Sequence, residues 1–400
     1  MTGSAQGPLG GFRVLDLSRV LSGPYCTLQL ADMGAEVIKV EVPGRGDDTR
    51  AWGPPFVAGE SAYFLSVNRN KKSITLNLRH PEGAVLLRRL VQVSDVLVEN
   101  FRPGVLERLG FGYEACRAWR PELVYCSISG FGHSGPRRSE PGYDIVIQGE
   151  GGIQSLTGDP GGPSFRVGVA QADLVAGLYA CQGILLALLH RQRGGAGQWV
   201  DVAMLDAQIA LLTYQAGNYF ASAVVPQRLG NRHPNIAPYE TFATADGDLN
   251  LAIGNEKLWR DFCPLVGLGA LAEDPRFATN AARLANYEAL RAALGPLLVR
   301  RRCAEWIELL RGHGIPCGPV RDLAQVFDDP QVAARQMRCQ VEHARAGTLE
   351  TTGVPVKLSA TPGAVREPPP LLGEHNREIY VGLLGLEEER LAVLEQQGVI

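Results

Sequence analysis

The first 130 residues alternate between short apolar runs and segments with helical spacing. FRVLDLS (12–18) and AEVIKVE (35–41) read as strands, and YCTLQLADMG (25–34) between them reads as a helix that ends in glycine. Two strands joined in this way lie parallel in one sheet. A further helix is predicted at 81–94 and further strands at 95–100 and 123–130. The pattern therefore predicts a doubly wound α/β domain.

A single long apolar segment follows, QADLVAGLYACQGILLALLHRQRG (171–194). It carries no charge between Asp173 and His190 and approaches the length of a membrane span. It also contains Gly177, Gln182 and Gly183, and no other segment of the chain resembles it. We therefore expect a buried helix of a soluble protein that does not associate with a membrane.

The composition changes at VVPQRLGNRHPNIAPYETF (224–242), which is rich in Pro, Asn and Arg. Such a segment is typical of a linker. The chain is therefore divided into 1–226, a second module at 227–330, and a tail at 331–400.

Charge and cysteine content narrow the functional classes. The net charge of −3 gives no strong field that would favour nucleic acid. The eight cysteines include no C-x-x-C pair, which favours reduced thiols, and the scattered histidines argue against a metal site. MTGSAQGPLGGF (1–12) lacks the basic and apolar regions of a signal peptide. We expect a cytoplasmic protein without metal.

Asp173, at the start of the long apolar segment, has two possible roles. Aspartate is a good helix cap, because its side chain accepts a hydrogen bond from an unpaired backbone N–H. A carboxylate oriented at a helix start beside an apolar wall can also act as a nucleophile. For an isolated aspartate the cap is the more common role, so other parts of the chain have to decide.

Basic side chains gather in three segments, each of which follows or leads into a predicted strand. They are NRNKKSITLNLR (68–79), ENFRPGVLERLG (99–110) and GPRRSEPGYD (135–144), the last with Arg137 and Arg138. Cations at strand ends of an open α/β sheet bind phosphate groups. No Walker loop is present, and the first turn, RVLSGPY, lacks G-x-G-x-x-G although Glu41 ends the second strand. A solvated basic surface is the better explanation for any one of these segments, but three of them in one α/β domain favour a polyphosphate ligand, and the missing glycines argue against a nicotinamide or flavin.

Several long blocks together resemble the class III CoA-transferases, the CaiB/BaiF group, along almost the whole chain. The blocks are VLDLSRVLSGPYCTLQLADMGAEVIKVE (14–41), SAYFLSVNRNKKSITLNL (61–78), DVLVENFRPGVLERLG (95–110), SISGFGHSGP (127–136), GVAQADLVAGLYA (168–180), GIPCGPV (314–320) and PPPLLGEH (368–375). The resemblance implies a Rossmann-like large domain built from both chain ends, with 331–400 as linker and return, and a smaller α/β domain inserted between them. It also implies an interlocked, ring-like homodimer.

The resemblance assigns the nucleophile to Asp173. The positions that it assigns to CoA binding, together with neighbouring basic residues, are Leu21, Ser22, Arg69, Lys72, Leu76, Asn77, Leu78, Arg79, Asn100, Phe101, Arg102, Arg108, Arg138 and Tyr143. One departure is Val42, where some members have an arginine, and Arg45 and Arg69 are the alternatives for its role. No permanently bound cofactor is implied, because coenzyme A enters and leaves as acyl-CoA substrate.

The implied reaction moves CoA from an acyl-CoA to a free carboxylic acid through an aspartyl-CoA thioester. The blocks look most like the succinyl-CoA:glutarate branch, so we expect succinyl-CoA as donor and a short dicarboxylate such as glutarate as acceptor. Arg228, Arg232 and His233 are candidates to face the second carboxylate, with a solvated linker as the alternative. The glycine-rich loop of formyl-CoA transferases is missing, which counts against oxalate.

Two other functions remain as alternatives. α-Methylacyl-CoA racemases of this family use a histidine in a G-H-D stretch, which here reads Gly142, Tyr143, Asp144. Tyrosine is too weak a base for that role, and His133 lies ten residues earlier. The other alternative is a non-catalytic acyl-CoA-binding protein, in which Asp173 would only cap its helix.

Overall fold

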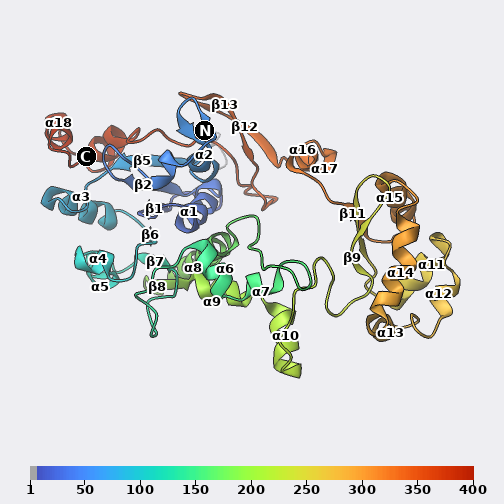
Figure 1. Cartoon of the computed structure of the whole chain (residues 1–400). Helices are drawn as coiled ribbons and strands as arrows, with labels where there is room; N and C mark the ends of the chain where they lie inside the picture. The colour runs from blue at the N-terminus through green and yellow to red at the C-terminus, as the bar shows by residue number, and fades with distance from the viewer. Residues whose placement is uncertain (1–6) are drawn as a thin grey trace. The chain divides into compact units, whose positions relative to one another are not determined.

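The computed structural model describes residues 7–400 and shows two compact units (Figure 1). The first comprises the chain up to 154, residues 166–223 and residues 330–400, and the second comprises 155–165 and 224–329. The sequence placed the divisions after 226 and 330 and did not assign 155–165 to the second unit. Residues 1–6, which form part of the segment that lacks a signal-peptide pattern, lie outside the described residues.

A six-stranded parallel sheet forms the centre of the first unit. Its strands are β1 (Arg13–Asp16), β2 (Glu36–Glu41), β5 (Lys71–Thr75), β6 (Val96–Glu99), β7 (Val124–Ser129) and β8 (Trp199–Ala203), in the order β5-β2-β1-β6-β7-β8. The prediction of an α/β fold with a parallel sheet is confirmed. The chain adds strands on one side of β1 and then crosses to β6 on the other, so the topological switch point lies between β1 and β6.

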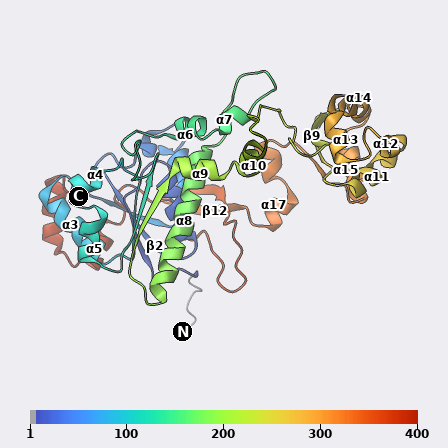
Figure 2. The ribbon, with the colours of Figure 1, turned by 90° about the horizontal axis from the view of Figure 1, so that it is seen from below.

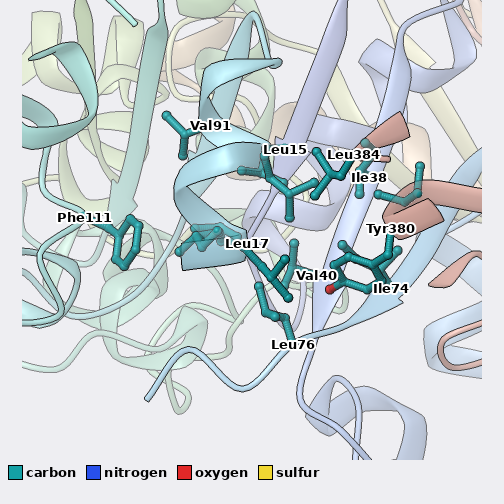
Figure 3. Close-up of a cluster of buried hydrophobic side chains, with 14 of the residues drawn as sticks. Leu15, Leu17, Ile38, Val40, Ile74, Leu76, Val91, Phe111, Tyr380 and Leu384 are labelled. Carbon is teal, nitrogen blue, oxygen red and sulfur yellow. The ribbon is translucent and has the colours of Figure 1, made fainter. Parts of the chain in front are cut away.

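Helices cover both faces of this sheet. One face packs on α1 (Ser22–Asp32), α8 (Gln171–Gln192) and α9 (Met204–Ala210), and the other on α3 (Pro81–Gln92), α5 (Tyr113–Trp119), a π-helix (Glu378–Leu383) and α18 (Glu388–Gln396). Successive strand residues point to opposite faces. Val14 therefore joins the α1–α8 core, whereas Leu15 joins the cluster drawn in Figure 3.

The C-terminal segment completes the second of these cores. Tyr380 packs among the strand residues of Figure 3, and its hydroxyl donates to the backbone oxygen of Thr75 at 2.8 Å. The side chain of Asn376 accepts from the backbone N–H of Thr75, also at 2.8 Å. Both ends of the chain therefore build one domain.

Shorter elements surround this framework. They are a 3₁₀ turn (Asp48–Ala51), β3 (Phe56–Val57), β4 (Glu60–Ser61), α2 (Ala62–Val67), α4 (Val105–Arg108), α6 (Asp144–Glu150), α7 (Ile153–Leu156), α10 (Thr213–Ser222), α17 (Pro330–Ala334), β12 (Arg338–His343) and β13 (Gly347–Thr352). β12 and β13 form an antiparallel hairpin.

The second unit has its own antiparallel sheet and core. Its elements are β9 (Tyr239–Ala243), β10 (Asp248–Ala252), α11 (Glu256–Leu265), α12 (Ala270–Glu273), α13 (Asn280–Ala285), α14 (Tyr287–Leu298), α15 (Cys303–Gly312), β11 (Cys317–Pro319) and α16 (Leu323–Phe327). Trp259, Phe262 and Trp306 lie at the centre of this core. Arg283 is fully buried beside them and forms an ion pair with Glu256 at 2.7 Å.

The long apolar segment forms α8, which is long and apolar enough to cross a membrane by length and composition. Figure 2 shows α8 lying along one face of the sheet. Its alanine-rich side packs on the sheet and on α1, and Ala172, Ala176, Ala180 and Ile184 are fully buried there. Its outer side exposes Leu178, Tyr179, Leu185, Leu186 and Leu189. The prediction of a buried helix therefore holds for the side of α8 that faces the sheet, whereas the other side is exposed.

Candidate active site

The segments that follow β1 and β6 meet at the topological switch point. Asn100 follows β6, and its side chain accepts from the Arg19 backbone N–H at 2.8 Å and donates to the Arg19 backbone oxygen at 2.7 Å. The same amide lies 3.4 Å from the hydroxyl of Ser22. Because β1 and β6 are neighbours, Asn100 can hold the turn that leads into α1.

A buried ion pair holds the backbone of that turn through hydrogen bonds. Lys39 of β2 donates to Asp47 at 2.8 Å, and neither side chain is exposed. Lys39 also donates to the backbone oxygen of Ser18 at 3.0 Å, and Asp47 accepts from the backbone N–H of Val20 at 3.2 Å. Val20 has a φ of 69°, which a valine rarely adopts, so these contacts are needed to hold the turn.

Asp173 lies in the first turn of α8, facing this turn. Ser22, the first residue of α1, offers its hydroxyl and its backbone N–H to this carboxylate as donors that lower its pKa. The cap position of α8 is Ala170, so Asp173 is not the N-cap residue of its own helix. The carboxylate instead lies where the N-termini of two helices meet, and partial positive charge at such ends favours an anion.

Burial nevertheless makes this carboxylate costly to ionise. Burial, and then the negative charge of Asp144, raise the pKa of Asp173 to about 7, against the opposite effect of the Ser22 hydrogen bonds. A carboxylate with a raised pKa is a stronger nucleophile once it is ionised, and perturbed pKa values of this kind are frequent at functional sites.

Gly177 allows α1 and α8 to approach closely enough for these hydrogen bonds. It lies one turn beyond Asp173, and a Cβ atom built on it would come 2.7 Å from the backbone oxygen of Ser22 and 3.2 Å from the Tyr25 ring. Any side chain at 177 would therefore push the start of α1 away from Asp173.

Tyr63 and Asp47 were not among the residues that the sequence singled out. Tyr63 belongs to α2, and burial, followed by the charges of Asp173, Asp144 and Asp47, raises its pKa to about 12. It is therefore a neutral hydroxyl close to the two carboxylates. No sequence motif separated it from the apolar residues of the SAYF stretch (61–64), since only the fold brings α2 to the start of α8.

The predicted CoA-binding residues only partly come together. Leu21, Ser22, Asn100 and Phe101 lie at the switch point, and Arg19 stacks on Phe101 with 5.2 Å between the guanidinium carbon and the ring centre. Asn77, Leu78 and Arg79 follow β5 at the same edge of the sheet, but the side chain of Leu76 is in the core. Among the predicted CoA-binding residues, Arg79, Arg102, Arg108 and Arg138 are exposed and form no ion pair within residues 7–400, and Tyr143 is also exposed.

Arg69 and Lys72 do not fit the prediction. Arg69 forms a two-point ion pair with Asp32, with N–O distances of 3.1 and 2.7 Å, and is almost fully buried. Lys72 pairs with Glu36 at 2.7 Å and with Glu378 at 2.6 Å. Arg69 precedes β5 and Lys72 lies near its start, so both are at the amino edge of the parallel sheet. The buried ion pair with Asp32 gives Arg69 a structural role. Arg69 therefore cannot take over CoA binding from the arginine that some family members have at the position of Val42.

The other alternative for that role, Arg45, forms an ion pair with Asp48, and Val42 itself is exposed. Arg45 is also largely exposed, so it lies on the surface after β2. Its place at the carboxyl edge keeps it among the candidate phosphate-binding cations.

The proposed acceptor-binding residues lie in the second unit. Arg228 donates to the backbone oxygen of Gly162 at 2.7 Å, Arg232 lies over the Tyr287 ring at 3.5 Å, and the His233 ring lies 5.2 Å from that of Tyr239. Arg232 also lines a cavity of about 470 Å³ with Glu240, Glu288 and Arg291. The acidic side chains of this cavity offset its two arginines.

His133 lies with groups other than Asp173. Its ring packs edge-on against Trp199, and its Nε2 atom lies 3.8 Å from a carboxylate oxygen of Glu99. Burial raises the pKa of Glu99 to about 7, although Ser127 and Phe101 donate hydrogen bonds to it. Within residues 7–400, no group of three or more His, Cys, Asp or Glu side chains could hold a metal ion.

Comparison with known proteins identifies the family. The model of CoA-transferase family III matches residues 9–376. The chain belongs to CoA-transferase family III. This membership makes the protein a CoA-transferase.

Relatives match this CoA-transferase over almost its full length. A succinate–glutarate CoA-transferase of Agrobacterium fabrum is 44% identical over 95% of this chain and 96% of its own. A succinyl-CoA:glutarate CoA-transferase of Mus musculus is 42% identical over 98% of this chain and 90% of its own. The crystal structure of a CaiB/BaiF family protein from Brucella suis superimposes with a TM-score of 0.84 at 44% identity, covering 94% of this chain and 100% of that one.

Replacing Gly177 by alanine tests the dependence of the site on helix contact. We expect Gly177→Ala to lower kcat by roughly 10- to 100-fold, because misplacement by about 1 Å has that effect on a reacting group. Steady-state kinetics with an acyl-CoA donor measures the loss. Gly295→Ala, in α14 of the second unit, is the control, since a Cβ there would meet nothing within 4 Å. Equal activity of both variants would contradict the packing argument.

Proposed function

We propose that this enzyme transfers CoA from succinyl-CoA to a short dicarboxylate through a thioester on Asp173. The Asp173 carboxylate attacks the thioester carbonyl and expels CoA thiolate, which leaves a mixed anhydride. The thiolate attacks the aspartyl carbonyl of the anhydride, releases succinate and forms the aspartyl-CoA thioester. The acceptor carboxylate repeats the two steps in reverse and restores the free aspartate.

The placement of Asp173 against Ser22 carries this proposal. The reaction requires a carboxylate that is oriented, is little hydrated and has hydrogen-bond donors beside it. The backbone N–H groups at the start of α1 supply donors for the negative oxygen, and the packed helices limit the access of water to the anhydride. No net proton transfer occurs, so the absence of a histidine at position 143 does not hinder the reaction.

The substrates are inferred from the relatives. The relatives from Agrobacterium fabrum and Mus musculus are both CoA-transferases named for glutarate. Each is more than 40% identical to this chain along nearly its whole length. A dicarboxylate needs a cation or several backbone donors for its distal carboxylate. Arg228, Arg232 and His233 remain the proposed candidates for that contact.

Removing the nucleophile should abolish transfer. We expect Asp173→Ala to lower kcat by roughly 1,000-fold or more while circular dichroism stays unchanged. Wild-type enzyme treated with succinyl-CoA and hydroxylamine should carry a hydroxamate on Asp173 that peptide mass spectrometry detects. Asp206→Ala, which removes an exposed carboxylate from the first turn of α9, serves as the control. Substantial turnover by a folded Asp173→Ala variant would refute the mechanism.

A panel of acceptors tests the substrate proposal. With succinyl-CoA as donor, we expect glutarate and related short dicarboxylates to be used best, with differences of roughly 10- to 200-fold for one methylene. Mass spectrometry of the CoA products reads the result, and the panel includes oxalate, monocarboxylates and aromatic acids. If a monocarboxylate or an aromatic acid outperforms every dicarboxylate, the proposed acceptor class is wrong, but the assignment of CoA-transferase activity still holds.

The functional unit that we propose is an interlocked homodimer. α8 exposes a stripe of large apolar side chains, and α10, which buries none of its residues, adds Tyr214, Tyr219 and Phe220. Phe220 is 80% exposed. Exposed apolar surface of this extent on a water-soluble unit indicates a protein interface, and a second copy of the chain is the partner expected from the family resemblance.

Sedimentation velocity tests the dimer. An interlocked pair has no simple path of dissociation, so we expect a dimer of about twice the 43.1 kDa chain mass to persist at low nanomolar concentration. A reversible shift to folded monomer on dilution would show that the chains are not interlocked.

A further inference from the structure

The first turn of α8 obtains a hydrogen-bond partner from another helix. The first N–H groups of a helix lack partners within it, and the cap residue of α8, Ala170, has no side chain that could accept. A carboxylate oxygen of Asp144, in the first turn of α6, accepts from the backbone N–H of Ala172 at 2.9 Å. Asp144 therefore caps the N-terminus of α8, which was one of the two roles considered for Asp173 from the sequence.

Asp144 is held in place through its second oxygen. Gln148, one turn along α6 and fully buried, donates from its amide nitrogen to Asp144 at 2.8 Å. The same amide nitrogen lies 3.3 Å from the backbone oxygen of Val169, and the amide oxygen accepts from the backbone N–H of Val167 at 2.8 Å. α6 and the segment that enters α8 are thereby fastened together around Asp144.

We propose that Asp144 is a positioning residue that caps α8 in place of Asp173, and that its negative charge strengthens Asp173 as a nucleophile. This inference rests on the proposed function of Asp173. With α8 capped by Asp144, the carboxylate of Asp173 is free to face Ser22. The two carboxylates are close enough for one charge to act on the other, which favours the protonated form of Asp173 and makes its ionised form more basic.

The other groups around Asp173 leave this effect in place. α1 contributes Ser22, and α2 contributes the neutral Tyr63. Asp47 is nearby, but its charge is paired with Lys39. Arg166, in the segment before α8, donates to the backbone oxygens of Val167 and Gly168. Among these groups, Asp144 is the charged one that acts on the ionisation of Asp173.

Two substitutions at 144 separate the cap from the charge. Asparagine keeps an oxygen that can accept from Ala172 but removes the charge and the second oxygen, which accepts from Gln148, whereas alanine removes all three. The pH dependence of kcat/KM is measured for wild type, Asp144→Asn, Asp144→Ala and the control Asp206→Asn. In wild type and in the control, activity should fall as pH decreases through about 7, because Asp173 becomes protonated there.

For Asp144→Asn we expect this fall to move by about one pH unit towards lower pH, since a neighbouring like charge has been removed. At pH 8.5, kcat should drop by roughly 3- to 10-fold because the nucleophile is less basic. Asp144→Ala should show the same pH displacement with a further loss of about 10-fold from the missing cap. An unmoved pH profile in Asp144→Asn overturns the charge effect, and equal kcat values for the two variants overturn the cap.

Infrared titration of wild type against Asp173→Asn gives a second measurement that requires neither turnover nor a variant at 144. The difference band of the Asp173 carboxylate should appear with a midpoint near pH 7. A midpoint below pH 5 would overturn the charge effect even if Asp173 is the nucleophile and Asp144 caps α8. Failure of the proposed function is recognised separately, by an Asp173→Ala variant that still transfers CoA.

Discussion

The close contact between α1 and α8 is the constraint on which the active site depends. Because position 177 carries no side chain, the backbone of Ser22 lies against α8 and its N–H reaches the Asp173 carboxylate. The same contact helps to bury the carboxylate, so the feature that orients Asp173 also raises its pKa. Orientation and basicity are therefore consequences of one packing arrangement.

Buried polar groups maintain that arrangement. Asn100 fastens the turn before α1 to the end of β6, and the Lys39–Asp47 pair fixes its unusual backbone from the other side. Breaking a buried ion pair leaves an uncompensated charge, which typically costs about 3–5 kcal/mol. These residues do not need to touch substrate to affect catalysis, because they determine where Ser22 lies.

The sheet topology explains why distant segments contribute to one site. In an open parallel sheet, ligands bind beyond the carboxyl ends of the strands at the point where the order reverses. Here that point lies between β1 and β6, where Ser22, Asn100 and Phe101 gather. Arg79 and Arg102 follow strands at the same edge, whereas Arg69 and Lys72 are at the amino edge with carboxylates as partners.

The sequence by itself determined the α/β fold and the family and made Asp173 a candidate, because strand and helix periodicity and long sequence blocks are local properties of the chain. It could not decide whether Asp173 caps its helix. The residue that does so, Asp144, lies 28 residues before Ala172, whose backbone N–H donates the hydrogen bond. It also grouped Arg69 and Lys72 with the ligand-binding cations, because they are near Arg79 in the chain although a five-residue strand carries the two groups to opposite edges of the sheet. Which charges face each other, and which are neutralised, was decided only by the tertiary structure, because electrostatic interactions depend on distance in space and on burial.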